Sequence, residues 1–530
     1  MKLGCIFALG MLAALPLAAA DDAIVPPPRV GAGPTQRRLT LDEAVELAIR
    51  SNLDVAVERT NVDRASEAAH GARGSFDPAF RWQPLFGDSN TPAESPLDGA
   101  NGLATQHSVG QTLAWHQKTP WNGLSLDAGF SQSRVTSGNP FVSLSRFYTS
   151  QLTITLTQPL LRGRKTDADR ALIKIRCKQR EGAAAELEIR AMATAASVEQ
   201  AYWDLVAARR QAEVSAESAN LAKVQLERDQ RMIAAGSLPA VELSAAQAEL
   251  AGRMDDLYRA TGAITEVENS LKSLLARDRH DDLWQDEIVP ADTGAVAPPV
   301  VIEMREALAE ALRRRPELKV VDADRAANRV QKQQDADLVK PQMNLVASYS
   351  LAGLAGTIRP GGGLLAQFGP ALALPGSLAG GVGSSLSSLF GGNYQSVQAG
   401  IALDLTARNR AARASLAADA IAEKRLDLLR ARAEQAIEAQ LRNALQALET
   451  ARQRMRAAAA SADAAEDKLA SESRLFAHGE STNFLVLTRQ NEYSAARRRQ
   501  VEADAAFNKA VSQYSASLGT TLSSRRIEVE

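Results

Sequence analysis

Two stretches of this chain alternate apolar and polar residues with a period of two. In one of them, Leu152, Ile154 and Leu156 alternate with threonines, and in another, Leu345, Ala347 and Tyr349 face away from Asn344 and Ser348. Such alternation predicts β-strands with one apolar and one polar face. The strands are expected at about 122–135, 147–158, 341–352 and 395–406.

A long helical pattern follows each pair of strands. Residues 162–235 and 408–477 contain no proline and are rich in alanine, glutamate, arginine and leucine. This predicts two helices on the order of 100 Å long. A glycine lies just after each run, and glycine commonly ends a helix. The turns are expected at 236–240 and 478–482, and the return helices at 241–277 and 483–518.

The order of elements occurs twice. Residues 236–250 align without gaps on residues 479–493, and the segment that starts at Glu306 resembles the one that starts at Glu43. Thr40 and Glu43 form a predicted capping box at the head of the first half, with a break in the helix near Ser51 and Asn52. Two tandem structural repeats are therefore expected, over 39–290 and 291–530, forming one integrated body.

The N-terminus reads as an export signal. Lys2, an apolar run and Ala18-Ala19-Ala20 predict a signal peptide over 1–20, followed by an extended, proline-rich arm over 21–38. No later apolar run approaches the ~20 residues of a membrane-spanning helix. The exported protein is then periplasmic, secreted or a β-barrel protein. Residues 76–117 contain strand-like pieces, such as 109–115, that the pattern does not place.

Composition narrows the possible functions. The net charge is -1, so there is no basic field for nucleic acid. Only Cys177 would remain after removal of the signal peptide, which excludes an intramolecular disulfide. Histidines are scattered, and no metal-binding, nucleophile or phosphate-loop motif is present. We assign no catalytic, cofactor-binding or metal-binding residue, and a secreted enzyme has only the signal peptide in its favour.

The predicted strands and helices both need neighbours. Four strands cannot close a barrel, and open sheet edges are not tolerated in lipid, so a membrane form requires several chains. Alanine on several helix faces, as in 183–185 and 457–460, fits helices that pack two neighbours in a tube. Two alternatives remain. The strands could form a small periplasmic sheet with one face on a core. The helices could form an ordinary coiled coil, with a seam at Ile437, Leu441, Leu445 and Leu448.

Several motifs in this order resemble the TolC family of outer-membrane efflux and secretion channels. They are the paired heads at 39–59 and 302–322, Thr157–Gly163 where a strand leads into a long helix, Asn409–Ala414 at the equivalent place, and the two glycine-marked tips. The resemblance implies a mixed α and β membrane protein. It implies a homotrimer in the cell outer membrane. Four strands from each chain would form a 12-stranded transmembrane β-barrel, which a long α-helical barrel would continue into the periplasm.

The same resemblance implies what the tips do. They would form the gate of a passive conduit and dock a periplasmic adaptor (membrane fusion) protein, which couples the channel to an inner-membrane pump of the RND, ABC or MFS type. Glu242 lies where an acidic gate residue is expected, whereas Ser481, Leu485 and Thr488 replace the arginine and acids expected in the second tip. The alternative function is a non-channel periplasmic coiled-coil scaffold, and the cargo is not specified. The candidate gate and docking residues are Gly236, Glu242, Gln247, Gly479, Leu485, Thr488 and Gln490.

Overall fold

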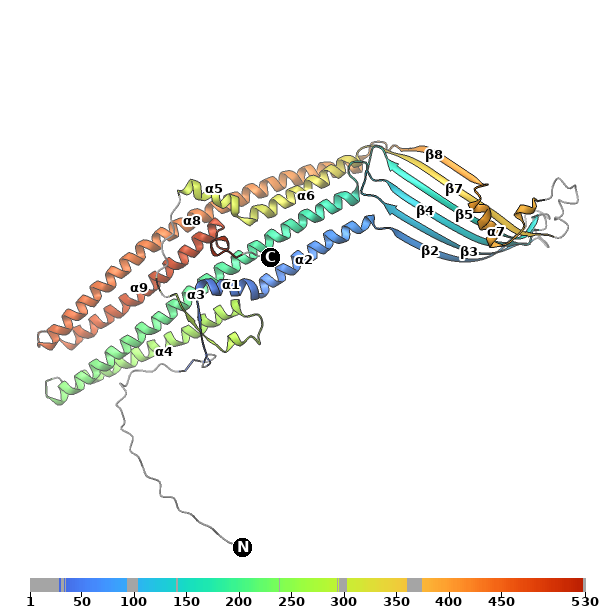
Figure 1. Cartoon of the computed structure of the whole chain (residues 1–530). Helices are drawn as coiled ribbons and strands as arrows, with labels where there is room; N and C mark the ends of the chain where they lie inside the picture. Colours follow the sequence, from blue (N-terminus) through green and yellow to red (C-terminus); the bar gives the residue numbers. More distant parts are fainter. Residues whose placement is uncertain are drawn as a thin grey trace, which may run out of the picture. The chain divides into compact units, whose positions relative to one another are not determined.

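The computed structural model describes residues 28–29, 33, 35–92, 103–139, 142–237, 239–292, 294, 303–359 and 374–527. The predicted signal peptide lies outside the described residues. The chain forms two compact units, each assembled from separate stretches. The first comprises residues 1–57, 188–315 and 435–530, and the second comprises 58–187 and 316–434. Figure 1 labels the elements along the chain.

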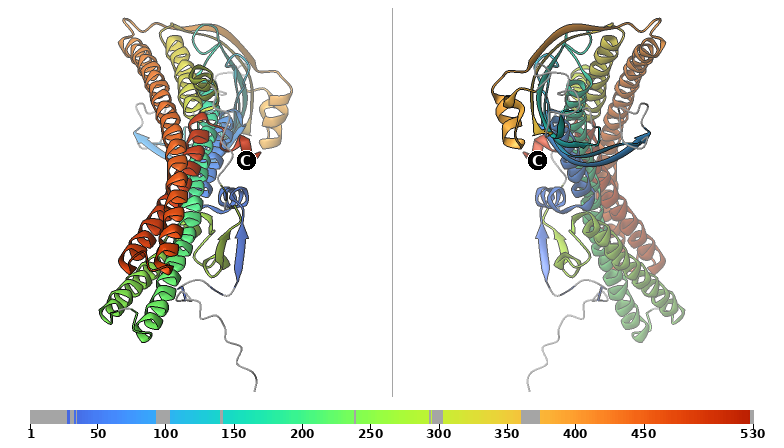
Figure 2. Two further views of the ribbon diagram at one scale, coloured as in Figure 1. Left: turned by 90° about the vertical axis from the view of Figure 1, so that its left-hand side faces the viewer. Right: turned by 90° about the vertical axis from the view of Figure 1, so that its right-hand side faces the viewer.

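The first unit contains two long helical hairpins (Figures 1 and 2). Helix α3 (Ala168–Ala234) turns into α4 (Val241–Leu275), and α8 (Arg410–Ala477) turns into α9 (Asn483–Leu518). Both α3 and α8 begin in the second unit. Helices α1 (Leu41–Ser51) and α5 (Met304–Arg314) are short. Within the described ranges, we find no helix with both the length and the apolar character needed to cross a membrane.

The hydrophobic core of this unit lies where α1 meets α3 and α4. Val45, Trp203 and Leu271 are among its fully buried side chains. The predicted capping box is formed at the start of α1: the Thr40 N–H donates to the Glu43 carboxylate at 2.9 Å, and the Glu43 N–H donates to Thr40 Oγ1 at 3.3 Å. The helix breaks at Asn52, whose Nδ2 donates to the carbonyl of Leu274 in α4 at 3.0 Å. This amide therefore fixes the break against the neighbouring helix.

Part of the predicted N-terminal arm is a strand. β1 (Gln36–Leu39) pairs in parallel with β6 (Glu287–Pro290). The Ala291 N–H donates to the Leu39 carbonyl at 2.8 Å, which extends this pairing. The prediction of an arm up to residue 38 was wrong for residues 36–38. No local pattern reveals such a strand, because its partner lies some 250 residues away in sequence.

A buried cluster of charges lies beside β6. The Glu268 carboxylate is 3.0 Å from Lys272 Nζ and 2.7 Å from Arg29 NH1, and it accepts from the Ile288 N–H at 2.9 Å. The Lys272 side chain is only 1% exposed and that of Glu268 3%. Nearby, burial of Glu287 works to raise its pKa, but the bonds and charges of Arg209 and Arg29 outweigh burial, so the pKa is lowered. The cluster thus brings paired acidic and basic side chains together inside the protein.

The second unit is built on a six-stranded antiparallel sheet. Its strand order is β2-β3-β4-β5-β7-β8. Four strands per chain were expected, so the structure corrects this number: the unplaced segment 76–117 supplies two more, β2 and β3. The bounds are β2 (Ala79–Pro92), β3 (Leu103–Lys118), β4 (Ser125–Ser137), β5 (Leu144–Pro159), β7 (Gln342–Ile358) and β8 (Gln395–Asp404).

Helices and short turns join the strands. Helix α2 (Leu53–Arg73) leads into β2, α6 (Pro316–Leu338) leads into β7, and α7 (Val382–Phe390) lies between β7 and β8 in the chain. Single 3-10 turns occur at Gly74–Phe76, Asp282–Trp284, Gly376–Leu378 and Ser523–Arg525.

The sheet is a curved band (Figure 2). The register places one apolar residue of each strand in a single row: Phe80, Trp115, Ala128, Ile154, Tyr349 and Val397. The neighbouring row on the opposite face carries Ala79, His116, Asp127, Thr155, Ser348 and Gln398. Because successive side chains point to opposite faces, these two rows give this part of the sheet an apolar and a polar face.

Helix α7 packs on the apolar face near the ends of β5 and β7. Gly353 lies on this face, and a Cβ there would come within 2.1 Å of the Ser385 carbonyl oxygen. Ser385 Oγ is fully buried, 2.9 Å from Ser150 Oγ and 3.1 Å from the Gly353 carbonyl. The lack of a side chain at Gly353 therefore allows the helix to dock directly on the strand.

We predict that Glu268→Gln destabilises the first unit by about 3–5 kcal/mol, because it leaves the buried Lys272 without its carboxylate partner. Glutamine can still accept from the Ile288 N–H, so the variant removes the negative charge and keeps this hydrogen bond. Chemical unfolding followed by the helical circular dichroism signal measures the effect. Glu46→Gln is the matched control, since Glu46 pairs with Arg50 on the surface, where such pairs contribute little. Equal unfolding midpoints for the two variants would contradict the prediction.

Candidate functional site

The two hairpin tips have the same backbone hydrogen bonds. At the first tip, the Gly236 N–H donates to the Ile233 carbonyl at 2.9 Å and the Ser237 N–H to the Met232 carbonyl at 2.9 Å. At the second tip, the corresponding donors are the N–H groups of Gly479 and Glu480, at 3.1 and 3.0 Å. Gly236 and Gly479 have φ angles of 73° and 79°. This is the Schellman motif, which needs a left-handed residue and therefore favours glycine.

The tips differ at the start of the return helix. Thr482 caps α9 by accepting from the Leu485 N–H at 3.4 Å. Ala240 precedes α4 and makes no side-chain cap. The fifth residue after each glycine is apolar and strongly exposed: Val241 is 74% exposed and Phe484 73%. Each tip therefore presents one large apolar side chain at the equivalent position.

The other predicted site residues lie around these turns in different environments. Leu485 is 37% exposed, and Gln247 is exposed on α4. Thr488 Oγ1 donates to the Phe484 carbonyl at 2.8 Å, and Gln490 is half-buried. Only Glu242 lies within hydrogen-bonding distance of the other hairpin, with its carboxylate 3.4 Å from Asn483 Nδ2.

A buried polar cluster links the two hairpins just behind the tips. Asp229 at the end of α3 has no exposed surface, and Asn483 at the start of α9 is 4% exposed. Asn483 Nδ2 donates to Asp229 Oδ2 at 2.9 Å. Gln225 Nε2 lies 2.9 Å from both Asp229 Oδ1 and Asn483 Oδ1. These three residues, with Glu242, form what we call the tip clasp.

Burial controls the charge state of the tip clasp. Burial is the main cause that raises the pKa of Asp229, and the nearby Glu242 carboxylate raises it further. The bonds from Gln225 and Asn483 and the charge of Arg228 act in the opposite direction but do not outweigh burial. Asp229 is therefore more readily protonated than an ordinary aspartate.

Further contacts join the hairpins or brace the second one. The Arg228 guanidinium lies 4.7 Å from the centre of the Phe476 ring, and Ser494 Oγ lies 3.0 Å from Ser218 Oγ. Arg489 is 2.8 Å from the Glu492 carboxylate and 3.7 Å from that of Glu472. The second tip thus has acid–arginine contacts at Arg489, a residue that the sequence analysis did not single out.

Of the tip clasp, sequence reasoning found only Glu242. Gln225, Asp229 and Asn483 resemble ordinary polar residues on helix surfaces, and the contact joins residues more than 250 positions apart. One local signal existed: Asn483 directly follows the capping threonine of the second tip. Nothing local singles out Asp229, because its burial arises only when the second hairpin packs beside the first.

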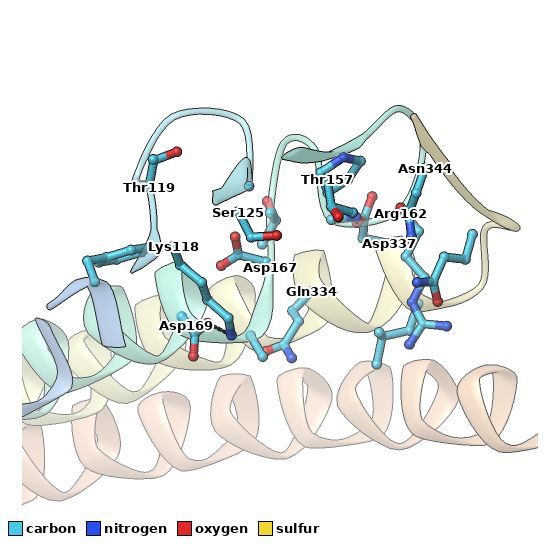
Figure 3. A pocket seen from close by; sticks show the side chains of 18 residues that line it. Lys118, Thr119, Ser125, Thr157, Arg162, Asp167, Asp169, Gln334, Asp337 and Asn344 are labelled. Atoms are coloured by element: carbon cyan, nitrogen blue, oxygen red, sulfur yellow. Dashed lines mark hydrogen bonds and ion pairs between the residues drawn. The ribbon is translucent and has the colours of Figure 1, made fainter. Parts of the chain in front are cut away.

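A second polar site lies in the other unit, where the strands meet the helices (Figure 3). This pocket of about 330 Å³ is lined by charged side chains, among them Lys118, Asp169 and Asp337. The buried Asp337 carboxylate accepts from the Gly163 N–H at 2.5 Å, and Lys118 Nζ is 2.8 Å from Asp169. Gly163, with a φ of 83°, ends the Thr157–Gly163 motif. The motif therefore anchors the end of β5 to α6. In the described residues, no group of three His, Cys, Asp or Glu side chains could hold a metal ion.

Comparison with known proteins shows what the chain is similar to. Residues 123–277 match the model of the family described as outer membrane efflux protein. Among solved structures, the outer-membrane channel OprN is 15% identical, with a TM-score of 0.60, and the alignment covers 90% of this chain and 89% of OprN. CusC is 15% identical, with a TM-score of 0.61, and the alignment covers 91% of this chain and 92% of CusC. The CmeC outer membrane channel of Campylobacter jejuni is 13% identical, with a TM-score of 0.60, and the alignment covers 90% of this chain and 85% of CmeC.

The fold of this chain is therefore that of the outer-membrane efflux channels. Residues 123–277, from the turn before β4 to just after α4, carry the outer membrane efflux protein domain, and the resemblance to the TolC family is confirmed. None of the curated proteins matches the chain.

We predict that the stability of the second tip depends on pH through Asp229. Because its pKa is raised on folding, its protonated form stabilises the tip clasp. This contribution is present below the ordinary carboxyl pKa and is lost as the pH rises through the raised value. Hydrogen exchange of the first turn of α9, corrected for intrinsic rates, should show protection that falls over this range.

Asp229→Asn should remove that pH dependence, because the side chain no longer titrates. Asp467→Asn, an exposed site on α8, is the control and should keep the wild-type profile. A wild-type profile in Asp229→Asn would contradict the assignment.

Proposed function

We propose that this chain is the outer-membrane channel of a multi-part efflux system, a passive conduit across the outer membrane and the periplasm. One observation carries the proposal: the row from Phe80 to Val397 places an apolar residue of each of the six strands on one face, and the neighbouring row on the opposite face is polar apart from Ala79. A sheet of this kind suits a barrel wall between lipid and a water-filled lumen. The match to outer membrane efflux proteins supports the same reading.

The channel is a homotrimer in this proposal. The sheet has two edges, β2 and β8, whose outer sides pair with no strand among the described residues. Unpaired backbone groups are not tolerated in lipid, so the edges must pair with other copies. Three copies would join their sheets into one barrel, and the long helices would form a periplasmic tube.

The tips are the periplasmic gate and the docking site for the adaptor protein of an inner-membrane pump. Three features support this: the identical turns at Gly236 and Gly479, the exposed Val241 and Phe484, and the clasp that holds the hairpins together. Opening would require the tip clasp to separate. The shared turn geometry also supports an origin of the two halves, 39–290 and 291–530, by duplication.

A periplasmic coiled-coil scaffold is less well supported. In that form, the apolar row from Phe80 to Val397 would face water. At the two ends of this row, Phe80 is 74% exposed and Val397 73% exposed in the single chain. Apolar surface of this extent needs lipid or protein to cover it. The family match and the sheet therefore favour the channel, which needs no catalytic residue because the pump supplies the energy.

We expect the expressed protein to fractionate with the outer membrane and to require detergent for extraction. Sizing with correction for bound detergent should give three chains per particle, because the open sheet edges need partners. A mutant with Ile401→Asp, a charge on the apolar face of β8, should assemble less well. Gln398→Asp, on the polar face of the same strand, is the control. A soluble periplasmic species would support the scaffold and exclude the channel.

We also expect Phe484→Glu and Val241→Glu to weaken adaptor binding without disturbing the trimer, because both side chains are exposed and leave the helix turns intact. Chemical cross-linking to the adaptor, together with export of a pump substrate in cells, measures the effect. Ala263→Glu, an exposed site on α4 away from the tip, controls for added charge. Undiminished cross-linking and export in the Phe484 and Val241 variants would refute the assignment of the tips.

A further inference from the structure

The β2–β3 hairpin lies outside the family match yet is fully part of the sheet. The match begins at residue 123, whereas the hairpin spans residues 79–118. β3 pairs with β4 along its length, from Gln106 opposite Ser137 to Lys118 opposite Ser125. Side chains also bridge the two strands: Gln111 Nε2 donates to Gln132 Oε1 at 3.1 Å, and His116 Nδ1 lies 2.5 Å from Asp127 Oδ1. The hairpin is therefore an extension of the sheet and not a separate appendage.

The hairpin has the same two faces as the other four strands. Its Phe80 and Trp115 continue the apolar row of the sheet, and its Trp82 and Leu113 continue the next row, which runs through Phe130. On the opposite face, Gln83 and Thr112 lie beside Ser131 of β4. A one-residue shift would place the aromatic residues on the polar face. The hairpin is therefore built for the same surroundings, with lipid on one side and water on the other.

The hairpin also changes which strand lies at the edge. Without it, β4 would be the edge strand, but in the structure β2 takes that place and β8 remains the other edge. Phe80, Trp82 and Phe86 of β2 are 74%, 66% and 86% exposed, and every residue of β8 is exposed. Six strands is an even number, so β8 of one chain and β2 of the next would be antiparallel and would continue the pattern of the sheet. Pro84 lacks an N–H, so the seam would lose at most one bond there.

We propose that β2 forms the subunit seam with β8 of a second copy of this chain, so that each chain contributes six strands and three chains close an 18-stranded barrel. This inference rests on the proposed function. It departs from the 12 strands that the family resemblance implies. Because barrel diameter grows roughly linearly with strand number, the lumen would be about half as wide again. Its wall would carry mainly hydroxyl and amide side chains, such as Thr112, Ser131 and Gln151, which suits bulky, polar cargo.

Disulfide cross-linking in native outer membranes tests the seam. In a Cys177→Ser background, Gln83→Cys on β2 is combined in turn with Ser396→Cys, Gln398→Cys and Gly400→Cys on β8, all on the polar face. The matched control replaces Gln83→Cys with Ser131→Cys on β4, the edge of a four-stranded arrangement. Thr112→Cys with Ser131→Cys, which are opposite each other in the register, reports whether the hairpin stays paired with β4 in the membrane.

The proposal expects at least one β2–β8 pair to give covalent dimers and trimers on a non-reducing denaturing gel. The β4–β8 pairs should stay monomeric, and the Thr112–Ser131 pair should close within one chain. Cross-linked trimers from β4–β8 pairs, without any from β2–β8, would overturn the 18-stranded barrel and leave the trimeric channel standing. A protein that is absent from the membrane and forms no cross-links between chains would overturn the proposed function and this inference together.

Discussion

The structure of the second unit depends on one constraint, which is that the backbone groups at the edge of a sheet must be paired. The sheet pairs its inner strands completely but ends at β2 and β8. In water these edges would risk aggregation, and in lipid they would carry a cost of several kcal/mol for each unpaired group. In the proposed channel, assembly with other copies pairs these edges, and the continuous apolar row is the surface that would meet lipid.

The first unit is held in a different way. Its apolar core is concentrated where α1 meets α3 and α4, and polar contacts, Asp229 with Asn483 and Ser218 with Ser494, join the two hairpins toward the tips. Polar contacts can be broken and re-formed with water at lower cost than a packed apolar core. A gate needs a region that can open without unfolding the rest of the unit. In the proposed channel, the position of the tip clasp beyond the apolar core would meet this need.

The glycine turns were predictable and the clasp was not, for a physical reason. The residue that follows each of these helices has a left-handed backbone conformation, which favours glycine. Residue type alone therefore places the turns at Gly236 and Gly479. Asp229 and Asn483 have side chains common on any helix surface, and their role comes from burial between two hairpins that are distant in sequence. For the same reason Arg489 was overlooked: its position beside Glu472 depends on how the two helices of one hairpin face each other.

The sequence by itself determined the strands with clean alternation, the two long helices and their turns, because each of these follows from a local period or from a residue with special backbone freedom. It did not determine the β2–β3 hairpin, since Pro84, Gly87 and Gly110 interrupt its alternation and only pairing with β4 reveals its faces. It also left β1 unrecognised, because a four-residue strand carries no period and exists only through its distant partner. Tertiary structure decided the number of strands, the edges of the sheet and the buried charges, since each of these depends on contacts between segments far apart in the chain.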